Sequence, residues 1–162
     1  LGVPTTFLLT SFYWDNLIHF GMGPRRGEDG VLTFALPIGN APMPGIAAED
    51  IGRCAYGIFR DSASWIGKTV GISGEHPTGT EMAAALGDAL GEEVRFFPIP
   101  ADTYRALGFP GAEDLGNMFQ FYEEFAGPFG AARDVERSRA LNPSLQSFRQ
   151  WLSANAARIP IG

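Results

Sequence analysis

The mostly apolar run Thr-Thr-Phe-Leu-Leu at residues 5–9 constrains the fold of this chain more than any other segment. Apolar and polar side chains do not alternate along it, so a strand formed there is buried on both faces. Such strands belong to parallel sheets that helices cover on both sides, and left alone they expose an edge prone to aggregation. The run therefore predicts an α/β fold in which residues 5–9 pair with other strands.

Strand and helix patterns alternate along the rest of the chain. Further strands are predicted at residues 31–36, 68–73 and 94–99, the last at a sheet edge because Pro98 cannot donate a backbone hydrogen bond. Glycines make residues 21–30 a loop. Helices are predicted at 46–60, from Thr78 to 90, shortly after Pro100, at 112–125, where Gly127-Pro128 breaks the pattern, and from Asn142-Pro143 onward. This order indicates one mixed α/β domain without repeats.

Two of these helices carry specific local signals. Glu49 and Asp50 fall in the first turn of the 46–60 helix, where negative charge suits the helix dipole. Thr78 stands three residues before Glu81, which is a capping-box spacing, and Gly91 is placed to end that helix. The 46–60 helix has one apolar face, made of Ile51, Cys54, Ala55, Ile58 and Phe59.

Composition excludes several classes of function. Eighteen acidic and twelve basic residues give a net charge of -6, and Lys68 is the only lysine, which argues against a direct nucleic-acid surface. Cys54 is the only cysteine and is expected to be buried, while His19 and His76 lie far apart, so no disulfide and no metal site are expected. No apolar run reaches the roughly 18 residues that span a bilayer, and the start lacks a charged signal region. We expect a cytoplasmic protein without a membrane segment.

Several catalytic and cofactor motifs are missing from this chain. No glycine-rich turn follows a strand and opens a helix, and the glycines of residues 108–116 link two predicted helices instead. There is no Gly-x-Ser-x-Gly elbow, and no tyrosine stands four residues before Lys68. A self-contained active site is therefore not visible, and the catalytic residues are unknown.

The stretch Tyr13-Trp14-Asp15-Asn16 is the strongest candidate for a binding site. Two large rings stand directly against an acid and an amide, just after the predicted 5–9 strand. One interpretation is a strand end that turns into a helix, with Asp15 or Asn16 as the cap. The other is one wall of a ligand pocket.

Four segments together resemble the NmrA-like family, atypical relatives of the short-chain dehydrogenases and reductases. They are GVPTTFLLTSFYWDNL, LPIGNAPMPGIAAEDIG, DTYRALGFPGAEDLGNMFQFYEEF and LNPSLQSFRQWL. The resemblance implies that residues 1–162 form the C-terminal part of a Rossmann-like NAD(P)-binding fold, with a smaller α/β substrate or lid region. It also implies that the Gly-x-x-Gly-x-x-Gly turn, which seats the pyrophosphate of the cofactor, lies upstream of Leu1.

The same resemblance assigns roles to residues of this chain. Tyr13, Trp14, Asp15 and Asn16 are expected to bind the cofactor on its nicotinamide side, through flat faces and through groups that donate or accept hydrogen bonds. Asp15 stands where the family commonly has a glutamate, which is longer. The acids of the segment GIAAEDIG, residues 45–52, are expected to cap a helix. The aromatic face of the 112–125 helix is made of Met118, Phe119, Phe121 and Tyr122. It is expected to belong mainly to the core, with at least one of Phe119 and Phe121 facing a pocket or a partner.

Three functions follow as hypotheses. The first is an oxidoreductase that uses NADPH or NADH to reduce a quinone-like or other small acceptor. The second is a redox sensor that binds NADP(H) without turnover and regulates a protein partner. The third is a stand-alone α/β module that binds another ligand. The choice between NADP and NAD stays open, as do the acceptor and a homodimeric state.

Overall fold

The computed structural model describes residues 2–161 and shows a mixed α/β chain, as predicted. The strands are β1 (Phe7–Leu9), β2 (Phe12–Tyr13), β3 (Arg25–Arg26), β4 (Leu32–Leu36), β5 (Gly45–Ile46), β6 (Thr69–Gly71) and β7 (Val94–Pro98). The helices are α1 (Asn16–His19), α2 (Ala48–Arg60), α3 (Ser62–Trp65), α4 (Gly79–Leu90), α5 (Ala101–Arg105), α6 (Ala112–Glu124), α7 (Ala126–Ala131), α8 (Val135–Leu141) and α9 (Phe148–Asn155), followed by the 3-10 turn η1 (Ala156–Arg158).

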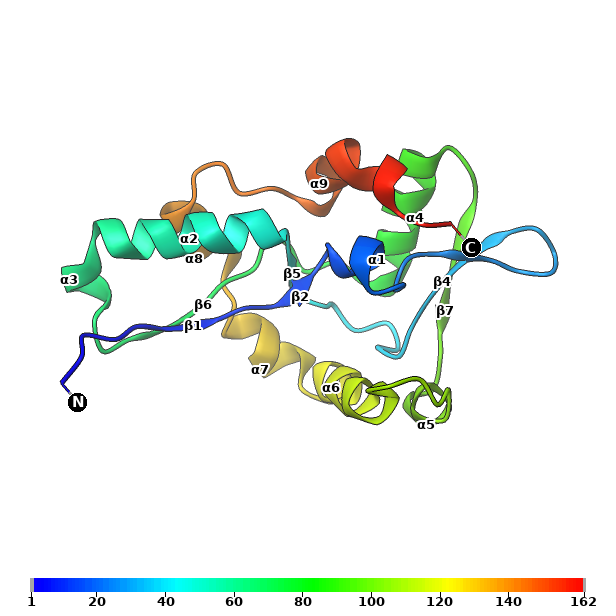
Figure 1. The fold of residues 1–162 in the computed structure, drawn as a ribbon, viewed down its shortest axis with the longest axis horizontal. Helices are drawn as coiled ribbons and strands as arrows, with labels where there is room; N and C mark the ends of the chain where they lie inside the picture. The colour runs from blue at the N-terminus through cyan, green and yellow to red at the C-terminus, as the bar shows by residue number, and fades with distance from the viewer. Residues whose placement is uncertain (1, 162) are drawn as a thin grey trace.

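The strands form small groups rather than one wide sheet. β1 pairs in parallel with β6, and β2 pairs in parallel with β5. β4 lies between β3, which is antiparallel to it, and β7, which is parallel. Figure 1 shows these groups along an elongated molecule, with α2 beside β1 and β6, with α4 beside β4 and β7, and with α9 beside α4. Strands at the predicted places are confirmed, including β7 at the edge of its group.

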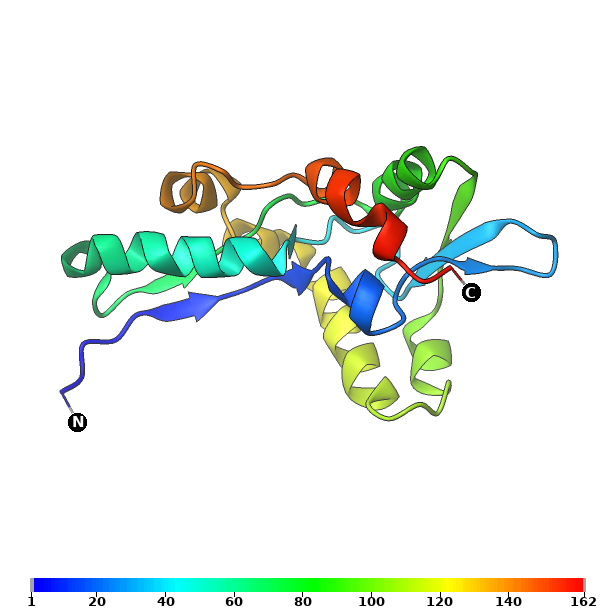
Figure 2. The same ribbon diagram turned by 45° about the horizontal axis from the view of Figure 1, so that its top comes forward.

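Strand β1 differs from its prediction in burial. Only Leu8 packs against a core cluster, the one beneath α2. Phe7 and Leu9 are 61% and 40% exposed. The prediction that this strand is buried on both faces is therefore wrong within the described residues 2–161. The physical reason is that α2 covers one face of the β1–β6 pair, and the second edge of β1 has no partner strand in the part of the chain that the structure describes. Figure 2 shows β1 running along the outside of the molecule.

Local capping signals explain the helix ends. Thr78 and Glu81 form the predicted capping box at α4, and Gly91 ends it in the left-handed conformation. The predicted start at Asn142-Pro143 is wrong, because Asn142 ends α8 and α9 begins after Ser147, which forms a second capping box with its N3 residue. The predicted end of the 112–125 helix is confirmed, because α6 ends at Glu124, but Gly127 and Pro128 lie just beyond that break. Both residues lie in the first turn of α7, where proline costs no hydrogen bond.

Helix α2 packs through part of its predicted face. Cys54 and Ile58 are buried, as predicted for the cysteine, but Phe59 points into solvent. Asp50 is buried as well, and its carboxylate accepts hydrogen bonds from Asn142 Nδ2 and from the backbone N–H of Gln146, both at 2.9 Å. Asp50 therefore does more than favour the helix dipole, because it holds the loop between α8 and α9 against α2.

Replacing Asp50 with alanine is expected to lower the free energy of unfolding by about 3 kcal/mol, since a buried and a part-buried donor lose their charged acceptor. Urea unfolding followed by circular dichroism measures the change. Glu49→Ala is the matched control one position earlier, where an exposed ion pair with Arg53 contributes about 0.5 kcal/mol or less. Equal effects of the two substitutions would contradict this role for Asp50.

Candidate functional site

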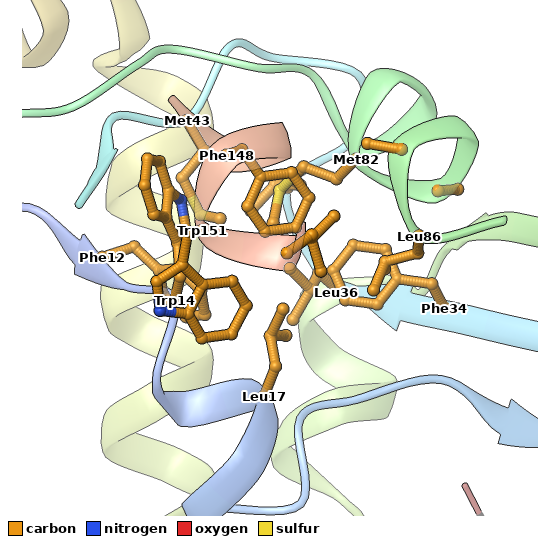
Figure 3. Packing of buried hydrophobic residues seen from close by; sticks show 14 of the residues in the cluster. Phe12, Trp14, Leu17, Phe34, Leu36, Met43, Met82, Leu86, Phe148 and Trp151 are labelled. Atoms are coloured by element: carbon orange, nitrogen blue, oxygen red, sulfur yellow. The ribbon is translucent and has the colours of Figure 1, made fainter. Parts of the chain in front are cut away.

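Trp14, the second of the predicted site residues, lies in the core. Its side chain has no exposed surface, and its ring centroid lies 5.4 Å from that of Phe148 and 6.3 Å from that of Trp151. Figure 3 shows it among these rings and the apolar side chains around them. Gly45 on β5 lies against the indole, and a Cβ atom there would collide with it. In this structure the Trp14 ring therefore presents no face to a ligand.

Asp15 and Asn16 lie at the start of α1. Asp15 Oδ2 accepts a hydrogen bond of 2.8 Å from the backbone N–H of Ala48, so the carboxylate caps the first turn of α2 and not the helix that it precedes. Asn16 is the first residue of α1 and is half-buried. The helix-cap interpretation thus fits Asp15, but the helix that it caps is α2 and not the adjacent α1.

Tyr13 is the most accessible of the four residues. Its side chain is 38% exposed at the end of β2, and its hydroxyl lies 3.1 Å from Thr10 Oγ1. Thr10 directly follows β1, so both hydroxyls lie beyond the carboxyl end of a parallel strand. That is the edge at which open α/β sheets bind their ligands.

Arg133 brings a positive charge to the same edge. Its Nε donates to the Thr10 carbonyl at 2.6 Å, and its guanidinium carbon lies 3.6 Å from the centroid of the Phe129 ring. Burial lowers the pKa of Arg133, and the nearby Tyr122 opposes that shift. Within residues 2–161 no carboxylate lies within 4.0 Å of its guanidinium. The cation is thus held by carbonyls and a ring face, which leaves its charge uncompensated.

Tyr122 completes the group. Its ring packs on Phe129 with centroids 4.4 Å apart. Burial raises the pKa of Tyr122, while the Arg133 charge lowers it and Tyr13 raises it, so both groups are electrostatic neighbours of its hydroxyl. We call Thr10, Tyr13, Tyr122, Phe129 and Arg133 the Tyr–Arg cluster. Its phenols and its guanidinium can donate hydrogen bonds to a carbonyl oxygen or to an anion.

Sequence reasoning found one member of the Tyr–Arg cluster as a site residue and missed Arg133. Tyr13 stands in the stretch that resembles the family, and Tyr122 belongs to the aromatic face of the predicted 112–125 helix. Arg133 lies 123 residues from the carbonyl it binds, and no local pattern marks it. The side chain of Ser11, between Thr10 and β2, is also notable because its buried hydroxyl has no hydrogen-bond partner in the described part of the chain.

The structure contains a concave feature away from the four predicted residues. It is a cavity of about 700 Å³ between the loop after α1, strand β4 and the connection from α5 to α6. No residue of the Tyr–Arg cluster lines it.

Metal-binding clusters and membrane-spanning helices are both absent from residues 2–161. These residues contain no group of three or more His, Cys, Asp or Glu side chains placed to hold a metal ion. None of their helices has both the length and the apolar character needed to cross a membrane.

Comparison with known proteins places this geometry in context. One relative, the Prestalk A differentiation protein A of Dictyostelium discoideum, is 26% identical over 125 residues, which cover 73% of this chain and 40% of the relative. The solved structure of NmrA, a negative transcriptional regulator in complex with NADP, matches 94% of this chain and 52% of its own length, with 21% identity and a TM-score of 0.74.

Two reductases have the same fold. The triphenylmethane reductase of Citrobacter sp., complexed with NADP(H), is 19% identical, with a TM-score of 0.72 over 95% of this chain and 53% of the reductase. An NADPH-dependent quinone oxidoreductase from Escherichia coli is 18% identical, with a TM-score of 0.68 over 91% of this chain and 52% of the oxidoreductase. The chain thus spans about half the length of the structures it matches. The model of the NmrA-like family matches residues 1–151, and the chain belongs to that family.

Proposed function

We propose that this chain is the C-terminal part of an NAD(P)H-dependent oxidoreductase that reduces a quinone-like or other small acceptor. The observation that carries the proposal is the Tyr–Arg cluster, which lies beyond the carboxyl end of β1 in a chain with the NmrA-like fold. Ligands of open α/β sheets bind at such an edge. Among the structural relatives, NmrA has been solved with NADP and with NAD, and two reductases use or bind NADP(H).

We assign the residues of this edge to the nicotinamide side of a dinucleotide. Tyr13 and Asn16 keep accessible or half-buried polar groups, and we propose them for the cofactor wall. Trp14 and Asp15 would then fix the position of this wall from the core and from α2. The unpartnered Ser11 hydroxyl supports a further polar group at this edge.

The phosphate-binding part of the site is proposed to lie in residues upstream of this chain. Phe7 and Leu9 expose apolar surface on the face of β1 opposite to α2, and the second edge of β1 is unpaired within residues 2–161. A neighbouring strand and a covering helix would bury both. The glycine-rich turn of the family would belong to that part and would seat the pyrophosphate.

The Tyr–Arg cluster has a defined chemical task in this proposal. The bound cofactor supplies the hydride. As a carbonyl acceptor takes up hydride, its oxygen gains negative charge, and donors aimed at that oxygen stabilise the charge. Tyr13 and Arg133 are the accessible donor and the uncompensated cation of the cluster. Their role would be to orient the acceptor and stabilise the charge on its oxygen.

A redox sensor that regulates a protein partner is the second candidate. Burial raises the pKa of Tyr122, which makes its hydroxyl a weak proton donor at neutral pH. Next to it, Phe121 and Phe125 stack with centroids 5.0 Å apart, and both are about half exposed. An exposed aromatic pair beside a cofactor site would suit the docking of a partner.

Incubation of the full-length protein with NADPH and menadione, followed at the NADPH absorbance band, tests these proposals. We expect steady oxidation, and we expect Tyr13→Phe to reduce kcat/KM about tenfold through the loss of one hydrogen bond. Tyr56→Phe, on the exposed side of α2, is the matched control and should change nothing. Tight NADPH binding without turnover would contradict the enzyme, whereas turnover at enzyme-like rates would contradict the sensor.

A further inference from the structure

The cavity beside β4 has the dimensions of a small-molecule site. Its volume of about 700 Å³ lies within the range of ligand pockets. Three separate segments enclose it, namely the loop from Phe20 to Gly27, strand β4, and residues 99–115 around the connection from α5 to α6. On β4 the cavity is lined by Thr33 and Ala35, which are small, and by Leu36 at the end of the strand.

The walls of the cavity gather apolar side chains that are otherwise exposed. Phe20, Leu107 and Phe109 are among the exposed large apolar residues of the chain, and all three line this one cavity. The Phe109 ring meets the Tyr104 ring edge to face, with centroids 5.6 Å apart. Apolar side chains that converge on a concave surface from distant segments mark a binding site more often than single exposed residues do. Aromatic walls opposite a flat strand favour a planar ligand.

The polar groups of the cavity indicate the charge of that ligand. Arg26 is neutralised by Glu92 through two hydrogen bonds of 2.9 and 3.0 Å. Arg25 has no carboxylate partner among the described residues, and its Nη2 only donates to the Gly21 carbonyl at 3.3 Å. No aspartate or glutamate lines the cavity. In a chain with a net charge of -6, this rim therefore carries a local positive charge.

Tyr104 supplies a second polar group. Its side chain is only 8% exposed and lines the cavity, and its hydroxyl makes no hydrogen bond to any residue in the described part of the chain. The buried side-chain atoms without a partner in residues 2–161 are Ser11 Oγ and Trp14 Nε1, so the Tyr104 hydroxyl is open to the cavity and is free to donate to a ligand.

We propose that this cavity binds a planar aromatic molecule that carries one carboxylate or similar anionic group. The ring system lies against β4 between Phe20 and Phe109. The anionic group pairs with Arg25, and the Tyr104 hydroxyl donates to a polar atom of the ligand. Because the Tyr–Arg cluster contributes nothing to the lining, this site is distinct from the proposed reaction site.

Fluorescence titration of the full-length protein with pyrene-1-carboxylate, in the absence of nucleotide, tests the proposal. The uncharged 1-pyrenemethanol is the matched ligand. We expect the carboxylate to bind about tenfold more tightly than the alcohol, and we expect Arg25→Gln to remove that preference. Arg95→Gln is the control variant, because Arg95 pairs with Asp29 and Glu93 and does not line the cavity.

Two further variants test the location of the site. Ala35→Phe fills the cavity from the strand and should abolish the binding of both pyrenes. Leu107→Glu places a negative charge at the exposed rim without removing a buried group, and it should weaken only the carboxylate, about tenfold. Equal binding of both ligands to the wild-type protein would overturn the proposal. So would an unchanged preference in both charge variants, or full binding by a folded Ala35→Phe protein.

Discussion

Replacement of Trp14 by alanine is expected to lower the free energy of unfolding by about 3–5 kcal/mol, the usual cost of removing a fully buried large ring. The indole packs against Phe148 and Trp151 of α9 and against Gly45 of β5, so its loss removes contacts to both elements at once. Urea unfolding followed by circular dichroism measures the change. A direct cofactor contact would give a different result, namely weaker dinucleotide binding with nearly unchanged stability.

Tyr13→Phe is the control for the neighbouring position. Its hydroxyl is exposed and bonds only to Thr10, so its removal should change the free energy of unfolding by about 0.5 kcal/mol or less. The two variants thus distinguish the structural role of Trp14 in the core from the proposed binding role of Tyr13. A small loss of stability in Trp14→Ala would contradict the core role assigned to the indole.

Gly71→Ala is the second substitution with a large expected effect. A Cβ atom at Gly71 would collide with the Ala132 carbonyl oxygen and would lie 2.8 Å from its carbon, and both atoms are backbone. The segment between α7 and α8 must therefore move, at a cost of about 3 kcal/mol. That segment carries Arg133, so the variant should also disturb the Tyr–Arg cluster. Thermal unfolding measures the loss of stability, and NADPH titration of the full-length protein measures the effect on the site.

Gly52→Ala is the control, and it is expected to raise the stability measured by thermal unfolding. Gly52 lies in α2, and a Cβ atom there meets nothing within 4 Å. Alanine in place of glycine inside a helix stabilises it by about 0.5–1 kcal/mol. If Gly71→Ala were as stable as the wild-type protein, the close packing of β6 on the α7–α8 segment would be wrong.

The sequence predicted best those features that depend on neighbouring residues. The capping box of Thr78 and Glu81, with Gly91 at the other end, defines α4 and is confirmed. The capping box at Ser147 was not predicted, because Asn142-Pro143 is an equally good signal for the start of a helix. The choice between these two start signals is decided by contacts, since Asn142 bonds to the buried Asp50 of α2.

Features that depend on distant residues could not be predicted in the same way. A tryptophan beside an acid is compatible with a pocket wall and with a core, and the rings of α9 decide between them. Exposure of β1 depends on which strands lie beside it, and its own composition predicts only that such strands are needed. Arg133 reaches the candidate site through the fold alone, because nothing near it in sequence distinguishes it from the other arginines.

The single cysteine gives this protein a built-in reporter of local opening. Burial, aided by the nearby Asp50, raises the pKa of the Cys54 thiol to about 11, and the thiol faces the Ser138 carbonyl of α8. Almost no reactive thiolate is present near neutral pH while α2 and α8 stay together. Alkylation by iodoacetamide then proceeds only through transient separation of these helices, and its rate gives the frequency of that separation without any engineered label.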